Sequence, residues 1–205
     1  VFKPTPDTSV YIATGNSKNP SQASVDGGCA ATNCNLKPET TKNYEIGAKA
    51  DLFDKRLLVS VAAFRNDRNN IRVASSEDGV PDQRLEGKQR VEGISLGASG
   101  NISDVWTLSA NYMYLKAKVL QSGSDFCANT TPVPATCTGV LTPGSYLQNT
   151  PKHSGSLFTS YRLPFGLEVG YGITYQGSFA LNSPTLGAPN TPLYKAPSYT
   201  IHRLS

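Results

Sequence analysis

The clearest pattern in the chain lies in residues 167–176, which read LEVGYGITYQ. Leucine, valine, tyrosine and isoleucine occupy the odd positions, whereas glutamate, glycine, threonine and glutamine occupy the even ones. Because side chains of a β-strand point alternately to opposite faces, this spacing predicts a strand with one apolar and one polar face. The alternation recurs in residues 44–52, 94–99 and 106–114, while residues 56–64 are apolar on both faces and leave their facing open. Amphipathic helical periodicity is almost absent, which favours an all-β chain.

Short turns and long polar segments alternate along the chain. Asp54-Lys55, residues 101–104 and residues 163–166 each connect two strands tightly. We expect eight strands, near residues 7–16, 41–53, 56–67, 88–100, 105–118, 151–162, 166–177 and 197–205. The long polar segments cover residues 17–40, 69–86, 119–149 and 179–196. An antiparallel transmembrane β-barrel of the outer membrane sorts its connections this way, with short periplasmic turns and long extracellular loops.

The length of the strands and the placement of the aromatic residues point the same way. The expected strands have about ten to fourteen residues, against about five to six in soluble sheets, and a tilted membrane strand needs about 9–11. Aromatic rings gather near both strand ends, as in the girdles of membrane barrels. They are Phe53, Trp106, Tyr161 and Phe165 beside short turns, and Tyr44, Tyr112, Tyr114 and Tyr175 toward the other ends. The alternative, a soluble secreted β-sandwich with an aromatic core, explains neither the strand length nor the polar second faces.

Composition excludes several other classes. The chain has 205 residues, of which 38% are hydrophobic and 17% charged, and it has no run of roughly 18 or more apolar residues that could form a transmembrane helix. Its first residues, Val1-Phe2-Lys3-Pro4, lack the apolar segment of a secretory signal. The net charge of +4 is scattered without a Lys/Arg run, so no nucleic-acid partner is expected. No HExxH, GxSxG or P-loop motif is present, and His153 and His202 belong to no catalytic group, so we expect no enzyme.

The four cysteines form two close pairs, Cys29 with Cys34 and Cys127 with Cys137. Four cysteines allow three connectivities, and local pairing is the most economical because each pair lies within one long polar segment. Zinc is the rival interpretation, but neither pair has the spacing of a zinc knuckle and neither histidine lies near them. We therefore expect two local disulfides, formed in an oxidising compartment outside the cytosol.

Several segments, in order, resemble the strands of a known family. Residues 36–47, LKPETTKNYEIG, look like the start of a barrel strand in that family, and residues 149–153, NTPKH, look like the start of another. Further similar segments are residues 57–69, 91–96, 106–114 and 163–175, although Ser95 stands where an acidic residue is usual. Together they resemble the C-terminal barrel of TonB-dependent outer-membrane receptors, over residues 8–205. Within that family, the sequences of these segments are most similar to those of the catecholate-type siderophore receptors.

The resemblance implies a barrel of about 22 strands, closed by an N-terminal plug that contacts TonB. Residues 1–205 are then a partial barrel domain of about eight transmembrane strands, with the plug and the final strands absent. A small closed eight-stranded barrel is the structural alternative, but such a barrel fills its interior with side chains. Small residues stand at several inward positions instead, namely Gly47, Gly97, Ser109, Gly170 and Gly172.

The resemblance also implies the function. It is that of an outer-membrane receptor and transporter for ferric siderophores, of catecholate type and energised through TonB, in a Gram-negative cell. No cofactor is implied, since iron arrives only within the siderophore. Outer-membrane lipid and lipopolysaccharide are the other expected partners, and a monomer is expected. The alternative function is a porin-like or small structural outer-membrane barrel without active transport.

A receptor for ferric catecholates needs cations and aromatic rings near its outer loops. The ligand is a compact anion with aromatic rings, so arginine can supply charge, hydrogen bonds and stacking together. The candidates for ligand contact are Arg68, Arg72, Arg84, Lys88, Arg90 and Tyr146. The plainer alternative is that these arginines pair with acidic residues such as Glu77, Asp78 and Asp82, or with lipopolysaccharide phosphates.

Overall fold

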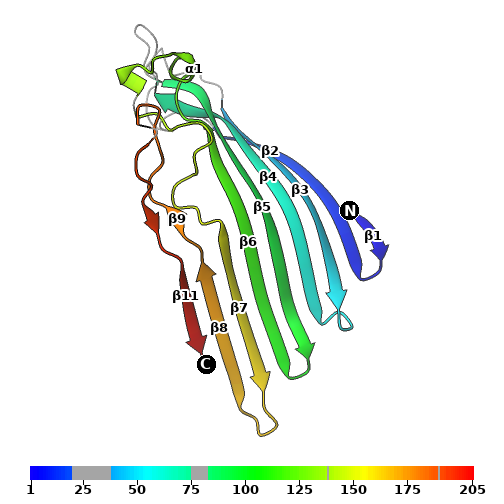
Figure 1. Ribbon diagram of the computed structural model, residues 1–205. Helices are drawn as coiled ribbons and strands as arrows, with labels where there is room; N and C mark the ends of the chain where they lie inside the picture. The colour runs from blue at the N-terminus through cyan, green and yellow to red at the C-terminus, as the bar shows by residue number, and fades with distance from the viewer. Residues whose placement is uncertain (20–37, 75–82, 138, 189) are drawn as a thin grey trace, which may run out of the picture.

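A computed structural model describes residues 1–19, 38–74, 83–137, 139–188 and 190–205. Its elements are β1 (Phe2–Thr5), β2 (Thr8–Asn19), β3 (Glu39–Leu52), β4 (Leu57–Ala74), β5 (Gln83–Ser103), β6 (Trp106–Gln121), α1 (Asp125–Asn129), η1 (Ala135–Cys137), β7 (His153–Arg162), β8 (Glu168–Gln176), β9 (Phe179–Ala180), β10 (Lys195–Ala196) and β11 (Tyr199–Leu204). Nine strands form one antiparallel sheet in the order β1-β2-β3-β4-β5-β6-β7-β8-β11, and β9 pairs with β10 separately. The sheet is a tall, curved wall in which neighbours in sequence are neighbours in space (Figure 1).

The eight expected strands are confirmed as β2 to β8 and β11. β4 and β5 exceed the expected length most, since β4 continues to Ala74 and β5 already begins at Gln83. Their ladder runs on through residues 69–74 and 83–87 with shifts of register, although the sequence predicts a long polar loop over residues 69–86. Backbone N–H and C=O groups pair across strands whatever the side chains are, so a polar stretch can extend a ladder that its neighbour continues.

The two ends of the wall differ, as the alternation of connections predicts. Short turns join β3 to β4, β5 to β6 and β7 to β8 at one end, called here the turn end (Figure 1). The strand ends that the longer connections join all lie at the other end, the loop end, and the connection after β6 contains the short helices α1 and η1. Among the described residues, no helix combines the length and the apolar character needed to cross a membrane.

The register of the strands gives the sheet two faces of different chemistry. Ile46, Ala63 and Ile94 lie side by side in one row. This side, called the apolar face, includes Ile12, Ile46, Val61, Ala63, Ile94, Leu96, Ala98, Ala110, Tyr112, Leu157 and Ile173. The other side, the polar face, includes Lys49, Ser60, Ser95, Gly97, Ser109, Asn111, Ser156 and Thr174. The pairing also resolves residues 56–64, whose facing the sequence left open, since Val61 and Ala63 fall on the apolar face.

The expected aromatic bands lie on the apolar face. At the turn end Trp106 and Tyr161 are register partners, and Trp106 Nε1 donates a hydrogen bond to Thr159 Oγ1 at 2.7 Å. Toward the loop end, Tyr112 Oη hydrogen-bonds His153 Nδ1 at 2.7 Å, and the ring centroids of Tyr114 and His153 are 5.2 Å apart. Rings with one polar edge suit the two interfaces of a bilayer, so these bands bound the part of the wall that suits lipid.

The wall is open. β1 and β11 are its two edges, and the described residues contain no pairing between them (Figure 1). The described strands therefore do not close into the small eight-stranded barrel weighed above as an alternative. An open sheet edge in lipid leaves backbone groups without partners, so these strands need neighbours on both sides to stand in a bilayer.

Candidate functional site

Arg68 lies on the polar face near the loop end of β4. Its Nη2 donates to Glu39 Oε2 at 2.6 Å, and the two residues form an ion pair between β4 and β3. The Arg68 side chain is 47% exposed, whereas the Glu39 side chain is only 15% exposed. The arginine therefore keeps an open side that a ligand could approach while its charge is partly balanced.

Arg90 lies on the opposite face. Its Nε donates to Asp67 Oδ1 at 2.6 Å, and Arg65 Nε donates to the other carboxylate oxygen at 2.9 Å. Partial burial raises the pKa of the Asp67 carboxyl, but hydrogen bonds from Arg90 and Arg65 outweigh this and hold that pKa below its ordinary value. Asp67 is two residues nearer the loop end of β4 than Arg65, on the same face, and Arg65 is the register partner of Tyr44. The cluster therefore lies beyond the apolar part of the wall.

The structure does not gather the candidate cations into one group. Asp67, the partner of Arg90, and Arg68 are consecutive residues on β4, so their side chains point to opposite faces of the sheet. Lys88 is exposed on β5, and no described residue forms an ion pair with it. Arg72 and Arg84 belong to β4 and β5, but their side chains lie outside the described part of the structure. Ligand contact by these five residues stays a prediction.

Tyr146 does belong to a cavity. A space of about 190 Å³ at the loop end is lined by Leu115, Tyr146, Lys152, Phe179 and Lys195, among others. Lys152 Nζ lies 4.8 Å from the centroid of the Tyr146 ring and 3.5 Å from its hydroxyl oxygen. Ser183 Oγ donates to the backbone oxygen of Tyr146 at 2.8 Å, which fixes the segment that carries the ring.

The cavity combines two ammonium groups, a phenol ring and apolar walls, which suits an anion that carries aromatic rings. Sequence reasoning found Tyr146 but missed Lys152 and Lys195. Lys152 stands inside the NTPKH motif, where it reads as part of a strand start, and Lys195 lies 43 positions further on in another polar segment. Among the described residues, no group of three or more His, Cys, Asp or Glu side chains could hold a metal ion.

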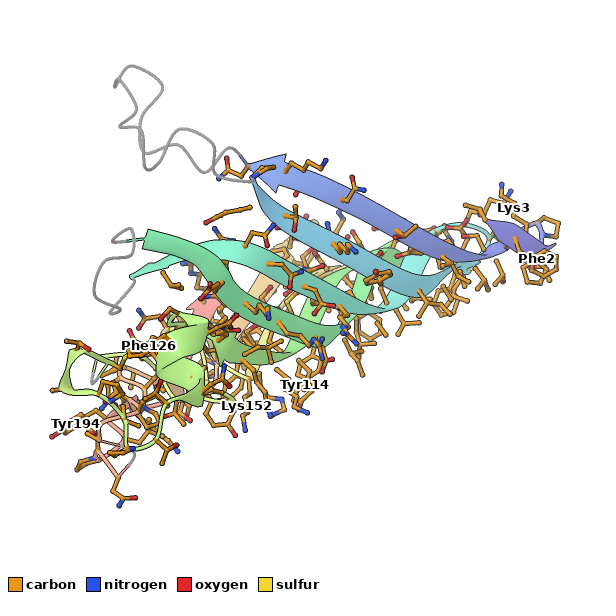
Figure 2. All side chains as sticks on the ribbon, turned by 90° about the horizontal axis from the view of Figure 1, so that it is seen from above. Phe2, Lys3, Tyr114, Phe126, Lys152 and Tyr194 are labelled. Atoms are coloured by element: carbon orange, nitrogen blue, oxygen red, sulfur yellow. A yellow bond between two sulfur atoms is a disulfide. The ribbon has the colours of Figure 1, made fainter. Side chains whose placement is uncertain are left out.

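In Figure 2, which looks down on the molecule from above, Phe126 and Tyr194 lie toward one side of the view and Phe2 and Lys3 toward the opposite side, with Lys152 and Tyr114 between them. The strand pairing gives the height of the cavity: the Leu115 amide donates a hydrogen bond to the Lys152 carbonyl oxygen at 2.8 Å, and Tyr114 is the register partner of His153. The cavity therefore begins one residue beyond the Tyr114–His153 pair, toward the loop end.

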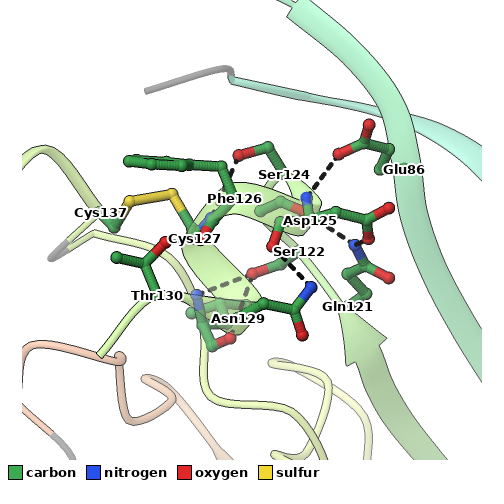
Figure 3. The surroundings of a disulfide bond; sticks show 12 residues. Glu86, Gln121, Ser122, Ser124, Asp125, Phe126, Cys127, Asn129, Thr130 and Cys137 are labelled. Atoms are coloured by element: carbon green, nitrogen blue, oxygen red, sulfur yellow. Dashed lines mark hydrogen bonds between the residues drawn. A yellow bond between two sulfur atoms is a disulfide. The ribbon is translucent and has the colours of Figure 1, made fainter. Parts of the chain in front are cut away.

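A disulfide ties the connection that follows β6. Cys127 and Cys137 are bonded, which confirms one of the two expected pairs, and both residues are buried. Cys29 and Cys34 lie outside the described residues. Figure 3 shows Ser124 capping α1, with Ser124 Oγ accepting a hydrogen bond from the Cys127 amide at 3.4 Å.

The same connection is tied to the wall by hydrogen bonds. Glu86 of β5 accepts a hydrogen bond from the Asp125 amide at 2.5 Å, and Gln121 Nε2 of β6 donates to Asp125 Oδ1 at 2.6 Å (Figure 3). These two bonds hold the start of α1 against the loop ends of β5 and β6, and the disulfide ties α1 to η1 within the connection.

Comparisons with known proteins agree with this architecture. Residues 1–205 match the family described as "TonB dependent receptor-like, beta-barrel". The chain is 33% identical over 167 residues to the catecholate siderophore receptor Fiu of Escherichia coli K12, which covers 82% of this chain and 20% of Fiu. It is 31% identical over 180 residues to the probable TonB-dependent siderophore receptor PiuA of Acinetobacter baumannii, covering 85% of this chain and 23% of PiuA. The chain thus spans less than a quarter of the length of these relatives.

Solved structures are similar over nearly the whole chain. The crystal structure of PiuA from A. baumannii superposes with a TM-score of 0.74 at 26% identity, covering 98% of this chain and 27% of that one. The closed form of Fiu from E. coli K12 superposes with a TM-score of 0.71 at 26% identity, covering 98% and 26%. With the family match over all 205 residues, the chain belongs to the TonB-dependent receptor β-barrel family.

Proposed function

We propose that the chain forms part of the wall of an outer-membrane receptor that takes up ferric siderophores of the catecholate class. The apolar face meets lipid, the polar face lines the interior, and the loop end faces the outside of the cell. TonB acts on a plug domain of the receptor, and these strands enclose that plug and carry the loops that bind the ligand. Iron is cargo in this proposal and needs no ligands from the chain.

The observation that carries the proposal is the cavity around Tyr146 in a chain of this family. A ferric catecholate is an anion with exposed aromatic rings, so it gains from ammonium charge and from an aromatic surface at once. Lys152, Lys195 and Tyr146 offer both, beside apolar walls that limit hydration. The catecholate receptor named among the relatives supports the same ligand class.

Uptake tests the function itself. The full-length receptor is expressed in a Gram-negative strain that lacks its own catecholate receptors, and cells are supplied with ⁵⁵Fe bound to 2,3-dihydroxybenzoylserine. We expect accumulation that disappears when TonB is deleted. Accumulation that persists without TonB would instead support the porin-like alternative, and no accumulation above the receptor-free strain would reject the ligand class.

Binding tests the cavity. The variant Tyr146→Ala/Lys152→Gln/Lys195→Gln of the purified full-length receptor is titrated with the same ferric complex. We expect Kd to rise at least tenfold, because two charges and a ring leave the cavity together. The control Lys3→Gln/Lys55→Gln removes as many lysine charges at the turn end and is expected to bind like the unaltered receptor. Equal affinity of the cavity variant and the control would remove the cavity from the ligand site.

The candidate arginines are tested separately. Replacing Arg68, Arg72, Arg84 and Arg90 together with alanine is expected to weaken binding of the ferric complex. Unchanged binding would remove all four from the site and leave their acidic partners as the reason for their presence. The arginines are replaced in a variant of their own because the described lining of the cavity around Tyr146 includes none of them, and Arg68 and Arg90 lie on opposite faces of the sheet.

A further inference from the structure

The cavity around Tyr146 is built by two connections that are far apart in sequence. Residues 122–152 link β6 to β7, and residues 177–198 link β8 to β11. The first connection supplies Tyr146 and Lys152, and the second supplies Lys195. The cavity therefore keeps its shape only if the two connections hold a fixed position relative to each other.

Backbone hydrogen bonds join the two connections directly. The Thr142 amide donates to the Pro184 carbonyl oxygen at 2.9 Å, and the Leu186 amide donates to the Val140 carbonyl oxygen at 2.8 Å. An antiparallel bridge lies between these two bonds. The connections thus form a short ladder of their own, although neither of them contributes a long strand there.

Two further bonds between the connections lie beside the cavity. The Asn149 amide donates to the Ala180 carbonyl oxygen at 2.9 Å, and Ser183 Oγ donates to the Tyr146 carbonyl oxygen at 2.8 Å. Ser183 is only 7% exposed. If its hydroxyl were lost, the Tyr146 carbonyl oxygen would lose a partner that water replaces poorly at a buried position.

The segment around Tyr146 is also bonded to the wall. The Val119 amide of β6 donates to the Ser145 carbonyl oxygen at 2.9 Å, and Lys118 and Tyr146 form an antiparallel bridge. The segment therefore lies between β6 on one side and the second connection on the other, and hydrogen bonds hold it on both sides.

We propose that these bonds assemble the cavity before a ligand arrives, and that Ser183 is a positioning residue that fixes Tyr146 for contact with the ferric catecholate. The inference rests on the proposed function, because it concerns the same cavity. All of these bonds run between atoms of the protein itself, so they need no ligand to form. A preformed cavity spares the ligand the entropy cost of ordering two connections. The rival device is a pair of independent connections that close over the ligand when it binds.

Hydrogen exchange tests the assembly without relying on ligand binding. The purified full-length receptor is exchanged in detergent and analysed by mass spectrometry with fragmentation to single residues. Relative to intrinsic rates, we expect the amides of Thr142, Asn149 and Leu186 to exchange at least tenfold more slowly than that of Gly187, which forms no hydrogen bond with the described residues. Ferric 2,3-dihydroxybenzoylserine is expected to change these rates less than twofold. Rates equal to that of Gly187 in the free receptor would overturn the preformed cavity.

Binding of the same ferric complex tests Ser183. In Ser183→Ala the segment that carries Tyr146 loses one of its holds, so we expect Kd to rise about tenfold and the Asn149 amide to exchange faster. Ser183→Thr keeps the hydroxyl and is expected to restore both values. The control Ser198→Ala removes an exposed hydroxyl from the same connection and is expected to change Kd less than twofold. Equal Kd values for Ser183→Ala and the control, or no recovery in Ser183→Thr, would remove Ser183 as a positioning residue.

The outcome is separable from that of the proposed function. Slow exchange in a receptor that does not bind the ferric complex would reject the proposed function and leave the assembly of the two connections standing. Normal uptake with fast exchange in the free receptor would reject only the preformed cavity. Stopped-flow association gives an independent measurement, since a preformed cavity predicts one phase whose rate rises linearly with ligand concentration. A second phase that saturates with ligand would show closure after binding and would overturn the inference.

Discussion

Replacing Leu96 with arginine tests which face of the sheet meets lipid. Leu96 lies on the apolar face of β5. On the same strand, Glu92, the register partner of Lys116, lies nearer the loop end, and Ser103, the register partner of Trp106, lies nearer the turn end. A rise of about 3.3 Å per residue and a tilt of about 40° advance the strand by about 2.5 Å per residue along the membrane normal. Along the membrane normal, Leu96 is then about 10 Å from Glu92 and about 18 Å from the level of Trp106. It therefore lies inside the apolar band, which is about 25 Å tall in membrane barrels.

The magnitude follows from this depth. An arginine on the lipid-facing side costs about 2–4 kcal/mol at the midplane and less near the interfaces, so we expect Leu96→Arg to lower the free energy of unfolding by about 2–3 kcal/mol. Ser95 is the matched control, since it is the preceding residue and points to the polar face. We expect Ser95→Arg to cost less than about 1 kcal/mol, because that face suits polar side chains.

The assay is equilibrium unfolding of the full-length receptor in phospholipid vesicles by guanidinium chloride, followed by tryptophan fluorescence. Equal losses for the two variants, or a larger loss for Ser95→Arg, would refute the assignment of the apolar face to lipid. Unfolding in vesicles must be reversible in both directions for the comparison, which is checked by refolding from the denatured side.

Gly100→Ala is expected to destabilise the protein by about 1–3 kcal/mol, since Gly100 has φ +140° and an added Cβ would meet the Arg56 carbonyl oxygen. Gly166→Ala, at φ +87° with open space around the added carbon, should lose less in the same unfolding assay, and the reverse order would contradict the steric argument. Cys127→Ser removes a loop constraint worth about 2.5–3 kcal/mol, and we expect faster limited proteolysis of the connection after β6. Reduction of the unaltered receptor should give the same cleavage, and no change in either would show that hydrogen bonds alone hold α1. Asp67 has a lowered pKa, so its stabilisation is complete above a pH of about 4 and is lost as the pH falls through its folded pKa. Stability measured against pH should therefore fall more steeply below pH of about 4 in the unaltered receptor than in Asp67→Asn, and parallel profiles would contradict the ion-pair account.

Local pattern sufficed for the fold where side chains alternate. Residues 167–176 became β8 with their faces as predicted, because period two is a direct property of the extended backbone. The same rule failed beyond Asn69 on β4 and before Lys88 on β5, where the stretches are short and the ladder shifts register. Pairing there depends on the neighbouring strand, which a single segment of sequence does not encode.

The site was harder to predict than the fold. Sequence chemistry selected cations and one aromatic ring as candidates, but Arg68 and Arg90 fall on opposite faces, because facing follows from the register between β4 and β5. Lys152 and Lys195 approach the same cavity from connections far apart in sequence, so no spacing could have linked them. The cluster of Asp67 with Arg65 and Arg90 likewise spans two strands.

The long strands have a consequence for how the cell surface is seen from outside. β5 begins at Gln83, nine residues nearer the loop end than Glu92. At the strand tilt used above, residues 83–92 rise about 20 Å along the membrane normal. In the proposed orientation, α1 and its disulfide lie beyond the lipid headgroups, on the paired strands that extend above them. An antibody or a phage fibre therefore contacts this extension before it contacts the bilayer. Since the Cys127–Cys137 bond and the Glu86–Asp125 contact fix the shape of the extension, it offers a conformational epitope rather than a linear one.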